Sequence, residues 1–442
     1  MFKNKKILIL GMAKSGFEAA KLLALHHNQI LVTDQKEQKK EDVQVLKELG
    51  VDFIVTDEPT KLLNDSFDYV IKNPGIHRSH PCVQKALELK IPVINEVEMA
   101  YTFLPKDVSI IGVTGSNGKT TTVTILYEIL KESGLPVHLG GNIGYPLSSL
   151  VNKVKAGDIL VLEISDHQLH DMYDFKTNIS ILTNLSQVHL DFNGTYENYQ
   201  QIKKRIFNHH TKHDLAILNQ DNEDVVKLTN DIPSRKLYFS SQRESDLCIK
   251  NQAIYYLDEK IIDLDMIRVQ GNHNYENIMC AIAAAKEFQV SNEAIKSVLN
   301  DFSGVEHRME YVRRLDGREF YNDSKSTNNQ STIIALSSFQ KPVILILGGL
   351  DRGQSFDELK DSMTYVKHVV CYGQTKEKIN EFCLKNQIDC VVLDDLESAV
   401  KVAYNLSDEE NVILFSPACA SQDQFQSFEE RGKLYKQYVE NL

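Results

Sequence analysis

Three times along the chain, a short run of apolar residues leads into a turn that contains glycine. The runs are Lys6–Leu10, Val108–Val113 and Pro342–Leu347. Stretches with helical periodicity follow these turns. Short apolar strands that alternate with helices indicate a parallel sheet with helices on its faces. The predicted fold class is therefore α/β, with three such blocks in series.

The blocks divide the chain into three predicted domains. Their expected ranges are 1–106, 107–305 and 306–442. Further short β-like runs predict antiparallel strands at one edge of the central sheet; these runs are 236–239, 253–257 and 260–264. Folds of this kind bind ligands at the carboxyl ends of their strands, so sites are expected there and in clefts between domains.

Composition excludes several classes of protein. With 49 Lys and Arg against 61 Asp and Glu, the formal net charge is −12. A nucleic-acid coat is therefore not expected, because a phosphate backbone requires a basic face. No apolar stretch reaches about 18 residues, so no membrane span is expected. Seven cysteines without a CxxC pair argue against a disulfide framework or a zinc cage, which favours the cytoplasm.

The strongest motif is the segment Gly112–Thr121, which reads GVTGSNGKTT between a strand and a helical stretch. In this setting backbone N–H groups hold phosphates, Lys119 neutralises them, and the Thr120 hydroxyl is placed for Mg²⁺. Val113 stands where the usual P-loop spacing has its first glycine. Glu163 ends a later strand and is a candidate to help hold Mg²⁺. The alternative is a glycine-rich turn with an unrelated lysine.

A second glycine turn, Gly11–Gly16, has the same strand–turn–helix setting, and Asp34 closes the next strand. The pattern is similar to the dinucleotide fingerprint, although Ala13 replaces its middle glycine. A tight turn without a ligand is the alternative. The loop Asn73–Gly75 follows another strand and is a candidate to line the same cleft.

Several further polar segments keep two interpretations. His189 follows a predicted strand, and it is either a structural histidine or a ligand of a metal ion. Lys203 reads as part of a solvated helix face. The segment Gly271–Asn277 is either a helix cap or a contact to a purine. Tyr321–Asn328 and Phe415–Phe425 are too polar for plain turns, but they indicate no chemistry on their own.

Taken together and in order, these motifs resemble those of the Mur ligases, and in particular of the members that add D-glutamate. The resemblance covers essentially the whole chain. It rests on GVTGSNGKTT, GNIG, TNLSQVHLD, GNHNYEN, HRMEYV, NDSKSTN and SPACASQDQFQSFEERG.

The resemblance implies a Rossmann-like, UDP-binding N-terminal domain, a P-loop-type mononucleotide-binding central domain with an antiparallel edge, and a Rossmann-like C-terminal domain. It implies ATP-dependent addition of D-glutamate to UDP-N-acetylmuramoyl-L-alanine through an acyl phosphate, in the synthesis of a peptidoglycan precursor. The implied cofactors are ATP and two Mg²⁺ ions. The expected state is a cytoplasmic monomer that binds neither nucleic acid nor membrane.

The resemblance also implies roles for individual residues. The catalytic set is Lys119, Glu163, His189 and Lys203. The metal ligands are Thr120, Glu163, His189 and Lys203 as its carbamate. The ATP contacts are Gly115, Ser116, Asn117, Gly118, Lys119, Thr120, Thr121, Asn274, Asn277, Arg308 and Asp323. The UDP-substrate contacts are Ala13, Lys14, Ser15, Asp34, Gln35, Lys36, Asn73, Gly75 and Asn142. The D-glutamate contacts are Lys325, Thr327, Arg352, Ser421 and Phe428.

Five residues in three places depart from the family pattern. Asp166 and His167 stand where Ser and Phe are usual, Gln35 and Lys36 vary the uracil end, and Arg352 replaces a lysine. Three other functions fit the sequence less well. A Mur ligase for diaminopimelate or lysine would carry an Asp-Asn-Pro-Arg motif, which this sequence lacks. A nicotinamide dehydrogenase leaves the P-loop unexplained, and a non-catalytic P-loop regulator leaves Glu163 and His189 unexplained.

Overall fold

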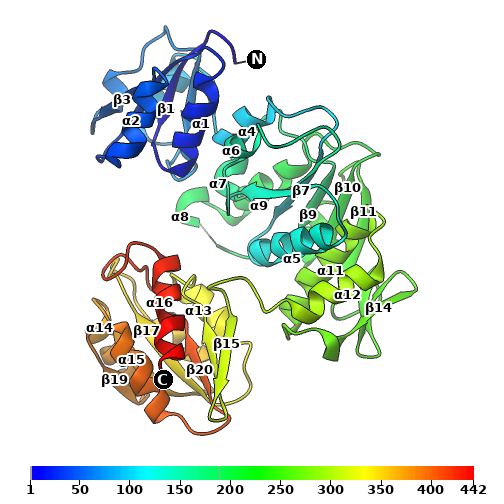
Figure 1. The fold of residues 1–442 in the computed structure, drawn as a ribbon, viewed down its shortest axis with the longest axis vertical. Coiled ribbons are helices and arrows are strands. Elements are labelled where there is room, and N and C mark those ends of the chain that lie inside the picture. Colours follow the sequence, from blue (N-terminus) through cyan, green and yellow to red (C-terminus); the bar gives the residue numbers. More distant parts are fainter. Residues whose placement is uncertain (1, 189) are drawn as a thin grey trace. The chain divides into compact units, whose positions relative to one another are not determined.

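The computed structural model describes residues 2–188 and 190–442, and it confirms the α/β fold class. The chain forms two compact units, one up to Phe302 and one from Ser303 to Leu442. The first unit holds a five-stranded and a nine-stranded sheet, and the second unit holds a six-stranded sheet (Figure 1). Each of the three expected ranges thus contains one sheet, while the domain boundaries at residues 106 and 305 stay predictions.

The first sheet is entirely parallel, with the strand order β3-β2-β1-β4-β5. Its strands are β1 (Lys6–Leu10), β2 (Gln29–Asp34), β3 (Asp52–Val55), β4 (Tyr69–Lys72) and β5 (Val93–Ile94). The helices are α1 (Lys14–Ala24), α2 (Lys40–Glu48), η1 (Pro59–Lys61), α3 (Pro81–Glu88) and α4 (Glu96–Tyr101). Ile7 and Ile9 pack into one core cluster and Leu8 and Leu10 into another, so β1 is buried on both faces. This explains its unbroken apolar run.

The central sheet has the strand order β14-β13-β12-β11-β10-β9-β6-β8-β7. Its strands are β6 (Ser109–Thr114), β7 (Val137–Gly141), β8 (Ile159–Glu163), β9 (Ile179–Leu182), β10 (Leu215–Asn219), β11 (Arg235–Ser240), β12 (Leu247–Lys250), β13 (Ala253–Tyr256) and β14 (Glu259–Asp263). The helices are α5 (Lys119–Glu132), α6 (Leu147–Leu150), α7 (Asp166–Leu169), α8 (Leu190–Asn193), α9 (Tyr196–Lys204), η2 (Arg205–Phe207), α10 (Glu223–Leu228), η3 (Leu264–Met266), α11 (Asn272–Lys286) and α12 (Asn292–Asp301).

The predicted antiparallel edge is confirmed for the last two of its three runs, which form β13 and β14. The run 236–239 was assigned wrongly, because it lies in β11, which pairs in parallel with β10. β12, which the sequence analysis missed, makes the change of direction: it is parallel to β11 and antiparallel to β13. The turn Asn251–Gln252, with φ of 49° and 57°, joins β12 to β13 as a tight hairpin.

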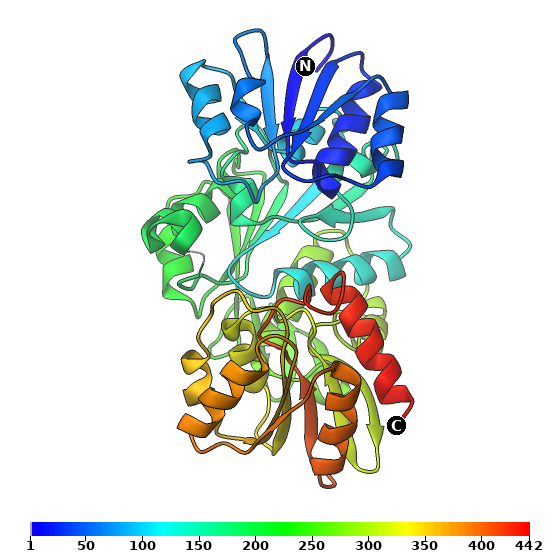
Figure 2. The ribbon, with the colours of Figure 1, turned by 90° about the vertical axis from the view of Figure 1, so that its left-hand side faces the viewer.

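The third sheet has the strand order β15-β16-β20-β17-β18-β19 and is parallel except for the edge strand β15. Its strands are β15 (Glu310–Leu315), β16 (Arg318–Asn322), β17 (Val343–Gly348), β18 (Val366–Tyr372), β19 (Cys390–Val392) and β20 (Val412–Phe415). The helices are α13 (Asn329–Leu336), η4 (Asp357–Ser362), α14 (Lys376–Lys385), α15 (Leu396–Leu406) and α16 (Phe428–Glu440). The final helix, α16, is the red helix beside this sheet in Figure 2. Across the described ranges, no helix is long and apolar enough to cross a membrane.

Candidate functional site

The loop between β6 and α5 has the backbone geometry that its glycines permit. Gly115 and Gly118 have φ of 145° and 83°. A Cβ atom on Gly115 would lie 2.0 Å from Thr183 Oγ1, and one on Gly118 would lie 2.1 Å from Asn277 Oδ1. Only glycine fits at both positions, because side chains from β9 and α11 pack directly on the loop. The extra residue in the motif is therefore accommodated in an ordered turn.

Thr183 and Asn184, which directly follow β9, hold this loop by hydrogen bonds. Thr183 Oγ1 donates to the Asn117 carbonyl at 2.6 Å, and Asn117 N donates to Asn184 Oδ1 at 2.9 Å. Ser116 N donates to the Asn184 carbonyl at 2.9 Å. Lys119 Nζ donates to the carbonyls of Gly115 and Ser116 at 2.8 and 2.9 Å. The lysine lies over the loop at the amino end of α5, where helix amides and a cation favour phosphate.

A hydroxyl and a carboxylate meet beside the loop, as the sequence predicted. Thr120 Oγ1 donates to Glu163 Oε2 at 2.7 Å, and Asn142 Nδ2 donates to Glu163 Oε1 at 2.8 Å. Thr120 and Glu163 are buried. Hard oxygen donors of this kind fit Mg²⁺, which takes one or two protein oxygens and completes its shell with water and phosphate. The described residues contain no group of three His, Cys, Asp or Glu that could hold a metal by itself.

Lys203 is completely buried, so its interpretation as part of a solvated helix face is wrong. Its Nζ donates to Thr114 Oγ1 at 3.1 Å and lies 3.6 Å from Asp166 Oδ1. Burial, and then the charge of Lys119, lower the pKa of Lys203 to about 7, against the opposing effect of Asp166. Near neutral pH, a lysine with this pKa is therefore present in part as the neutral amine. The predicted metal ligand His189 lies outside the described residues.

Tyr199 belongs to the same site, although the sequence analysis missed it. Its hydroxyl lies 2.8 Å from Ser116 Oγ, and its ring centroid lies 5.4 Å from Lys203 Nζ. Tyr199 is 1% exposed. Its spacing of four residues from Lys203 places both on one face of α9, which is the sequence signal that could have found it.

The unusual residue Asp166 connects α7 to two neighbouring segments. It is 2% exposed and faces Lys203 through one oxygen, while Asn193 Nδ2 donates to the other oxygen at 2.9 Å. His170 Nε2 lies 2.8 Å from Asn193 Oδ1. Asp166 and His170 thus hold Asn193, which ends the short helix α8. The aspartate that departs from the family pattern is therefore part of the wall around Lys203.

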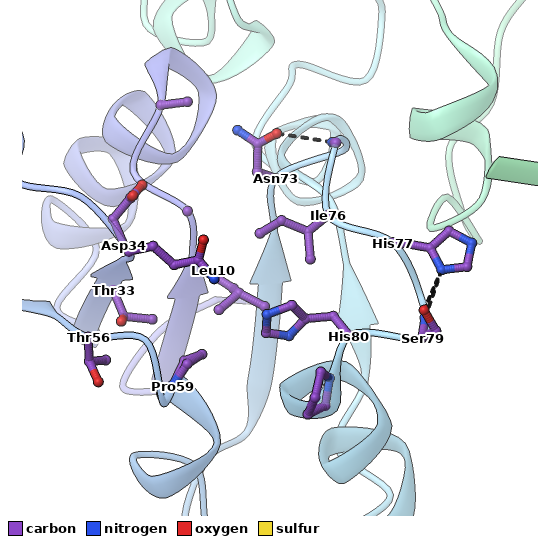
Figure 3. Close-up of a pocket in the computed structure, with 15 residues that line it drawn as sticks. Leu10, Thr33, Asp34, Thr56, Pro59, Asn73, Ile76, His77, Ser79 and His80 are labelled. Carbon is purple, nitrogen blue, oxygen red and sulfur yellow. Dashed lines mark hydrogen bonds between the residues drawn. The ribbon is translucent and has the colours of Figure 1, made fainter. Parts of the chain in front are cut away.

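A cavity of about 550 Å³ lies at the carboxyl ends of β1, β2 and β4 (Figure 3). Five of the predicted UDP-substrate contacts line it: Ala13, Asp34, Gln35, Asn73 and Gly75. Lys14, Ser15 and Lys36 are not among its lining residues. Lys14 Nζ instead donates to the Gly144 carbonyl at 2.6 Å, and Ser15 Oγ accepts from Asn73 Nδ2 at 3.5 Å.

The cavity also has walls that the sequence analysis did not identify. They include Thr56 and the segment with Ile76, His77, Ser79 and His80. Figure 3 shows the His80 side chain pointing toward Leu10. This segment directly follows the predicted loop Asn73–Gly75. Its position in the sequence, immediately after a predicted cavity wall, is the signal that could have identified it. Asp34 is engaged by the backbone, because its carboxylate accepts from Met12 N at 2.8 Å and from Lys36 N at 3.0 Å.

The two asparagines predicted to touch adenine lie on the first turns of α11. Asn277 is buried, and its Oδ1 accepts from Thr122 Oγ1 at 3.4 Å. Asn274 Nδ2 donates to the Gln270 carbonyl at 2.9 Å. Asn277 therefore lies against the phosphate-binding loop, while Asn274 is one turn nearer the start of α11.

In the second unit, Asp323 directly follows β16 and is buried. Its oxygens accept from Ser416 Oγ at 2.6 Å and from Met309 N at 3.2 Å. Burial raises the pKa of Asp323 to about 6, although these hydrogen bonds and the nearby Arg308 oppose the rise. Lys325 Nζ lies 5.9 Å from the centroid of the Phe428 ring. These predicted contacts are thus neighbours at one edge of the third sheet.

Arg431 brings the loops of this edge together and was missed by the sequence analysis. It is completely buried, and it donates to the Ser324 carbonyl at 2.7 Å and to the Ala420 carbonyl at 3.2 Å. Ser421, which follows Ala420 in the sequence, has a buried hydroxyl with no hydrogen-bond partner among the described residues. Arg352 is exposed and Thr327 half-buried on adjoining loops. A buried hydroxyl without a hydrogen-bond partner, next in sequence to the carbonyl that the Arg431 guanidinium binds, suits a polar or anionic ligand.

Phosphate-binding geometry at the amino end of α5, with a hydroxyl–carboxylate pair at its side, makes the central domain a nucleotide-binding P-loop domain. Family models match all three sheets. They are "Mur ligase MurD-like, N-terminal domain" over residues 5–95, "Mur ligase middle domain" over 113–285 and "Mur ligase, glutamate ligase domain" over 307–419. The chain belongs to the Mur ligase family and is an enzyme of the ligase class.

Curated relatives match along the full length of the chain. A UDP-N-acetylmuramoylalanine–D-glutamate ligase of Geobacillus sp. (strain WCH70) is 44% identical over 100% of this chain and 98% of its own length. Ligases of the same name from Bacillus pumilus (strain SAFR-032) and Enterococcus hirae are each 42% identical over 100% of this chain, and over 99% and 97% of their own lengths.

Solved structures share the fold at low sequence identity. The UDP-N-acetylmuramate-alanine ligase MurC of Thermotoga maritima is 18% identical, with a TM-score of 0.63 over 99% of both chains. The MurF ligase of Thermotoga maritima in complex with ADP is 18% identical, with a TM-score of 0.61 over 99% of this chain and 96% of that one.

Proposed function

We propose that this ligase uses ATP to join D-glutamate to UDP-N-acetylmuramoyl-L-alanine, releasing ADP and phosphate, in the synthesis of a peptidoglycan precursor. The observation that carries the proposal is 44% identity, over the whole chain, to a ligase named for these two substrates. The arrangement of the site supports the proposal, because it offers one region for each of the three substrates. The phosphate-binding loop would take ATP, and the cavity at β1, β2 and β4 would take the UDP substrate. The loops around Ser421 in the third sheet would take D-glutamate.

The chemistry follows from the poor reactivity of a carboxylate. The γ-phosphoryl group passes to the carboxylate of the UDP substrate, which forms an acyl phosphate with a good leaving group. The amine of D-glutamate attacks the carbonyl carbon and loses a proton, and the tetrahedral intermediate expels phosphate to leave an amide. Most of the catalysis is then positioning and neutralisation of charge.

In this proposal the central domain handles ATP. Lys119 and the amides of Gly115 to Thr121 hold the phosphates, and Asn274 and Asn277 contact adenine. Thr120 and Glu163 would hold Mg²⁺, which supplies charge neutralisation at the phosphate oxygens when bound. Arg308 and Asp323 contribute to the nucleotide from the C-terminal domain.

Lys203 would act as a carbamate. Its neutral amine adds CO₂ and loses a proton, which converts the neutral amine into an oxygen anion that suits Mg²⁺. Complete burial and a pKa of about 7 support this role, because both favour the neutral amine that reacts with CO₂. His189 is proposed as its partner at a second Mg²⁺.

The remaining residues would receive the two organic substrates. The proposed UDP-substrate contacts are Ala13, Lys14, Ser15, Asp34, Gln35, Lys36, Asn73, Gly75 and Asn142. The proposed D-glutamate contacts are Lys325, Thr327, Arg352, Ser421 and Phe428. We further propose domains at 1–106, 107–305 and 306–442 and a monomer that works in the cytoplasm, where ATP and nucleotide-linked sugars are available.

The test is phosphate release from ATP with both substrates together and with each one omitted. Release should require UDP-N-acetylmuramoyl-L-alanine and D-glutamate, and the product should carry one added glutamate by mass. Lys119→Ala is the negative control. It should release no phosphate above background, because it removes the charge that meets the transferred phosphoryl group. Release that ignores both substrates, or equal turnover with lysine or diaminopimelate, would refute the proposal.

The acceptor site has its own test. Arg352→Ala should raise the KM for D-glutamate about tenfold or more and leave the KM for ATP nearly unchanged, since a hydrogen bond to a charged group contributes about 1.5–3 kcal/mol. Lys360→Ala, which removes an exposed lysine of η4 in the same unit, is the control. Equal changes in both KM values would give Arg352 a different role.

A further inference from the structure

The carboxyl end of β4 and the segment that follows α7 are joined by a completely buried ion pair. Lys72 Nζ lies 2.7 Å from Asp171 Oδ2, and neither side chain is exposed. Arg78 lies at the rim of the pair, where its Nε is 3.8 Å from Asp171 Oδ1. A buried pair of this kind adds little net stability over well-packed apolar residues, because removing two charges from water is costly. The pair therefore contributes mainly to the relative position of the two segments that it joins.

On one side, the pair adjoins the wall of the cavity. Lys72 is the last residue of β4, and the next residues, Asn73 and Gly75, line the cavity. Asn73 N donates to the Leu10 carbonyl at 2.9 Å, and Gly75 N donates to Asn73 Oδ1 at 3.1 Å. The loop thus has its own internal hydrogen bonds, and Lys72 links its first residue to the central domain, in addition to the contact of His77 with the Phe192 carbonyl.

On the other side, the pair adjoins both parts of the ATP site. Asp171 N donates to the Gln168 carbonyl at 3.1 Å, and Gln168 forms a capping box with Ser165, two residues after Glu163. Arg205, two residues after Lys203, donates to the carbonyls of His170 and Met172 at 2.7 and 2.6 Å. Asp171 is therefore fixed from the strand end that carries Glu163 and from the segment that carries Lys203.

We propose that Lys72 and Asp171 form a positioning pair that sets the UDP-holding loop at a fixed place relative to the phosphate-binding loop. This inference rests on the proposed function. The substrate is anchored in the cavity by its UDP end, and its carboxylate must reach the γ-phosphoryl group of ATP held by the central domain. Neither residue touches the reacting atoms. The pair acts through Asn73–Gly75 on one side and through the Glu163 and Lys203 segments on the other.

The proposal separates binding from turnover. UDP binds to the first sheet and ATP to the central one, so each should bind normally when the pair is lost. Only turnover requires both in register, and a misplacement of about 1 Å can cost on the order of 100-fold in rate. We therefore expect kcat to fall about 10- to 100-fold, with the affinities for UDP and for ATP within about twofold of wild type.

The deciding variant is the double substitution Lys72→Met with Asp171→Leu. Lys72→Met alone leaves a buried carboxylate without its partner and is expected to unfold more easily, whereas the double variant removes both charges and should recover most of that stability. Lys72→Arg, which can still pair with Asp171, should keep kcat closest to wild type. Lys5→Met is the matched control, because Lys5 pairs with Asp68 at 2.8 Å before β1 and β4, in a half-exposed position.

Thermal unfolding, calorimetric binding of UDP and of ATP, and kcat are measured on all four variants. The proposal holds if the double variant is stable and binds both nucleotides but remains slow. It is overturned if the double variant recovers wild-type kcat, or if it loses UDP affinity, which would make Lys72 a part of the UDP site only. Ligation by the wild-type enzyme is measured in the same series and tests the proposed function separately, since the inference depends on the ratio of variant to wild type.

Discussion

Lys72 and Lys203 are both completely buried lysines, and each lies beside an aspartate, but their surroundings differ. Lys72 Nζ is 2.7 Å from Asp171, a direct ion pair. Lys203 Nζ is 3.6 Å from Asp166, hydrogen-bonds the neutral Thr114 hydroxyl, and is affected by the like charge of Lys119. Burial and Lys119 lower the pKa of Lys203 to about 7.

The difference teaches that burial alone does not give a lysine its role. An anion in direct contact gives a buried lysine a fixed ion-pair partner, as the geometry at Lys72 shows. A more distant anion and a neighbouring cation make the neutral amine accessible near neutral pH, as at Lys203. In the two roles proposed above, the same residue type therefore holds two domains in register at one position and supplies a reactive amine at the other.

The largest effect is expected on turnover when Lys203 is removed. Lys203→Ala should lower kcat about 1,000-fold or more, because the proposed carbamate is lost from the site where charge develops. Acetate or formate should partly restore the rate by replacing the carbamate oxygens. Lys204→Ala is the control, since its Nζ pairs with the exposed Asp231 at 2.7 Å and should leave kcat near wild type. Full activity of Lys203→Ala would refute the carbamate.

The second effect is opposite in sign for the two lysines. At pH 6.5, in CO₂-free buffer without ATP or Mg²⁺, Lys72→Met should lower the free energy of unfolding by about 3–5 kcal/mol, because Asp171 is left as an unpaired buried charge. Lys203→Met should instead raise it, because a costly buried ammonium is replaced by an apolar side chain. Denaturant unfolding gives both values. Changes of the same sign would mean that the two sites are electrostatically alike.

Part of this comparison could be predicted from the sequence. Features could be predicted where the residues that form them lie close together in the chain. The strand–turn–helix blocks, the P-loop and the walls Ala13, Asp34 and Asn73 depend on residues near one another in the chain, so periodicity and spacing were sufficient. Lys203 was not, because its burial depends on the packing of α9 against Thr114 of β6, 89 residues away. Lys72 and Asp171, 99 residues apart, carry no local signal for their pairing.

Other residues escaped prediction for related physical reasons. Arg431 has an acidic neighbour in sequence, Glu430, and so reads as a surface residue, yet it lies buried between the loops of Ser324 and Ala420. The run 236–239 has strand-forming residues, but strand direction depends on the pairing partner, which here is the parallel strand β10. Local pattern therefore predicts elements well, and it predicts poorly which polar side chains those elements enclose.

The third effect is the pH dependence that the lowered pKa of Lys203 causes. Well below pH 7, Lys203 is protonated in both folded and unfolded chains, so the cost of the buried ammonium is fully present. Between about pH 7 and pH 10.5 the unfolded chain keeps the proton that the folded chain has released, so stability rises with pH. The advantage of Lys203→Met over wild type should therefore shrink by about 2 kcal/mol from pH 6.5 to pH 9.

This pH dependence is measured by denaturant unfolding of wild type and Lys203→Met at both pH values in CO₂-free buffer. Lys204→Met is the control and should follow wild type at both, since its amine is paired at the surface. An advantage that stays constant or grows with pH would show that Lys203 titrates far from neutrality, and the contrast with Lys72 would then lose its electrostatic basis.

The smallest effect is expected for Tyr199. This residue contacts Lys203 and the phosphate-binding loop, and so distinguishes the environment of Lys203 from that of Lys72. Tyr199→Phe keeps the ring near Lys203 but removes the hydroxyl that lies 2.8 Å from Ser116 Oγ in the phosphate-binding loop. One neutral hydrogen bond contributes about 1 kcal/mol, so the KM for ATP should rise about fivefold while the UDP affinity stays unchanged. Tyr196→Phe is the matched control on the same helix, because its hydroxyl donates to Asp224 at 2.7 Å, away from the loop. Equal ATP KM values for the two variants would mean that the Tyr199 hydroxyl does not order the loop, and that α9 contributes only Lys203 to the site.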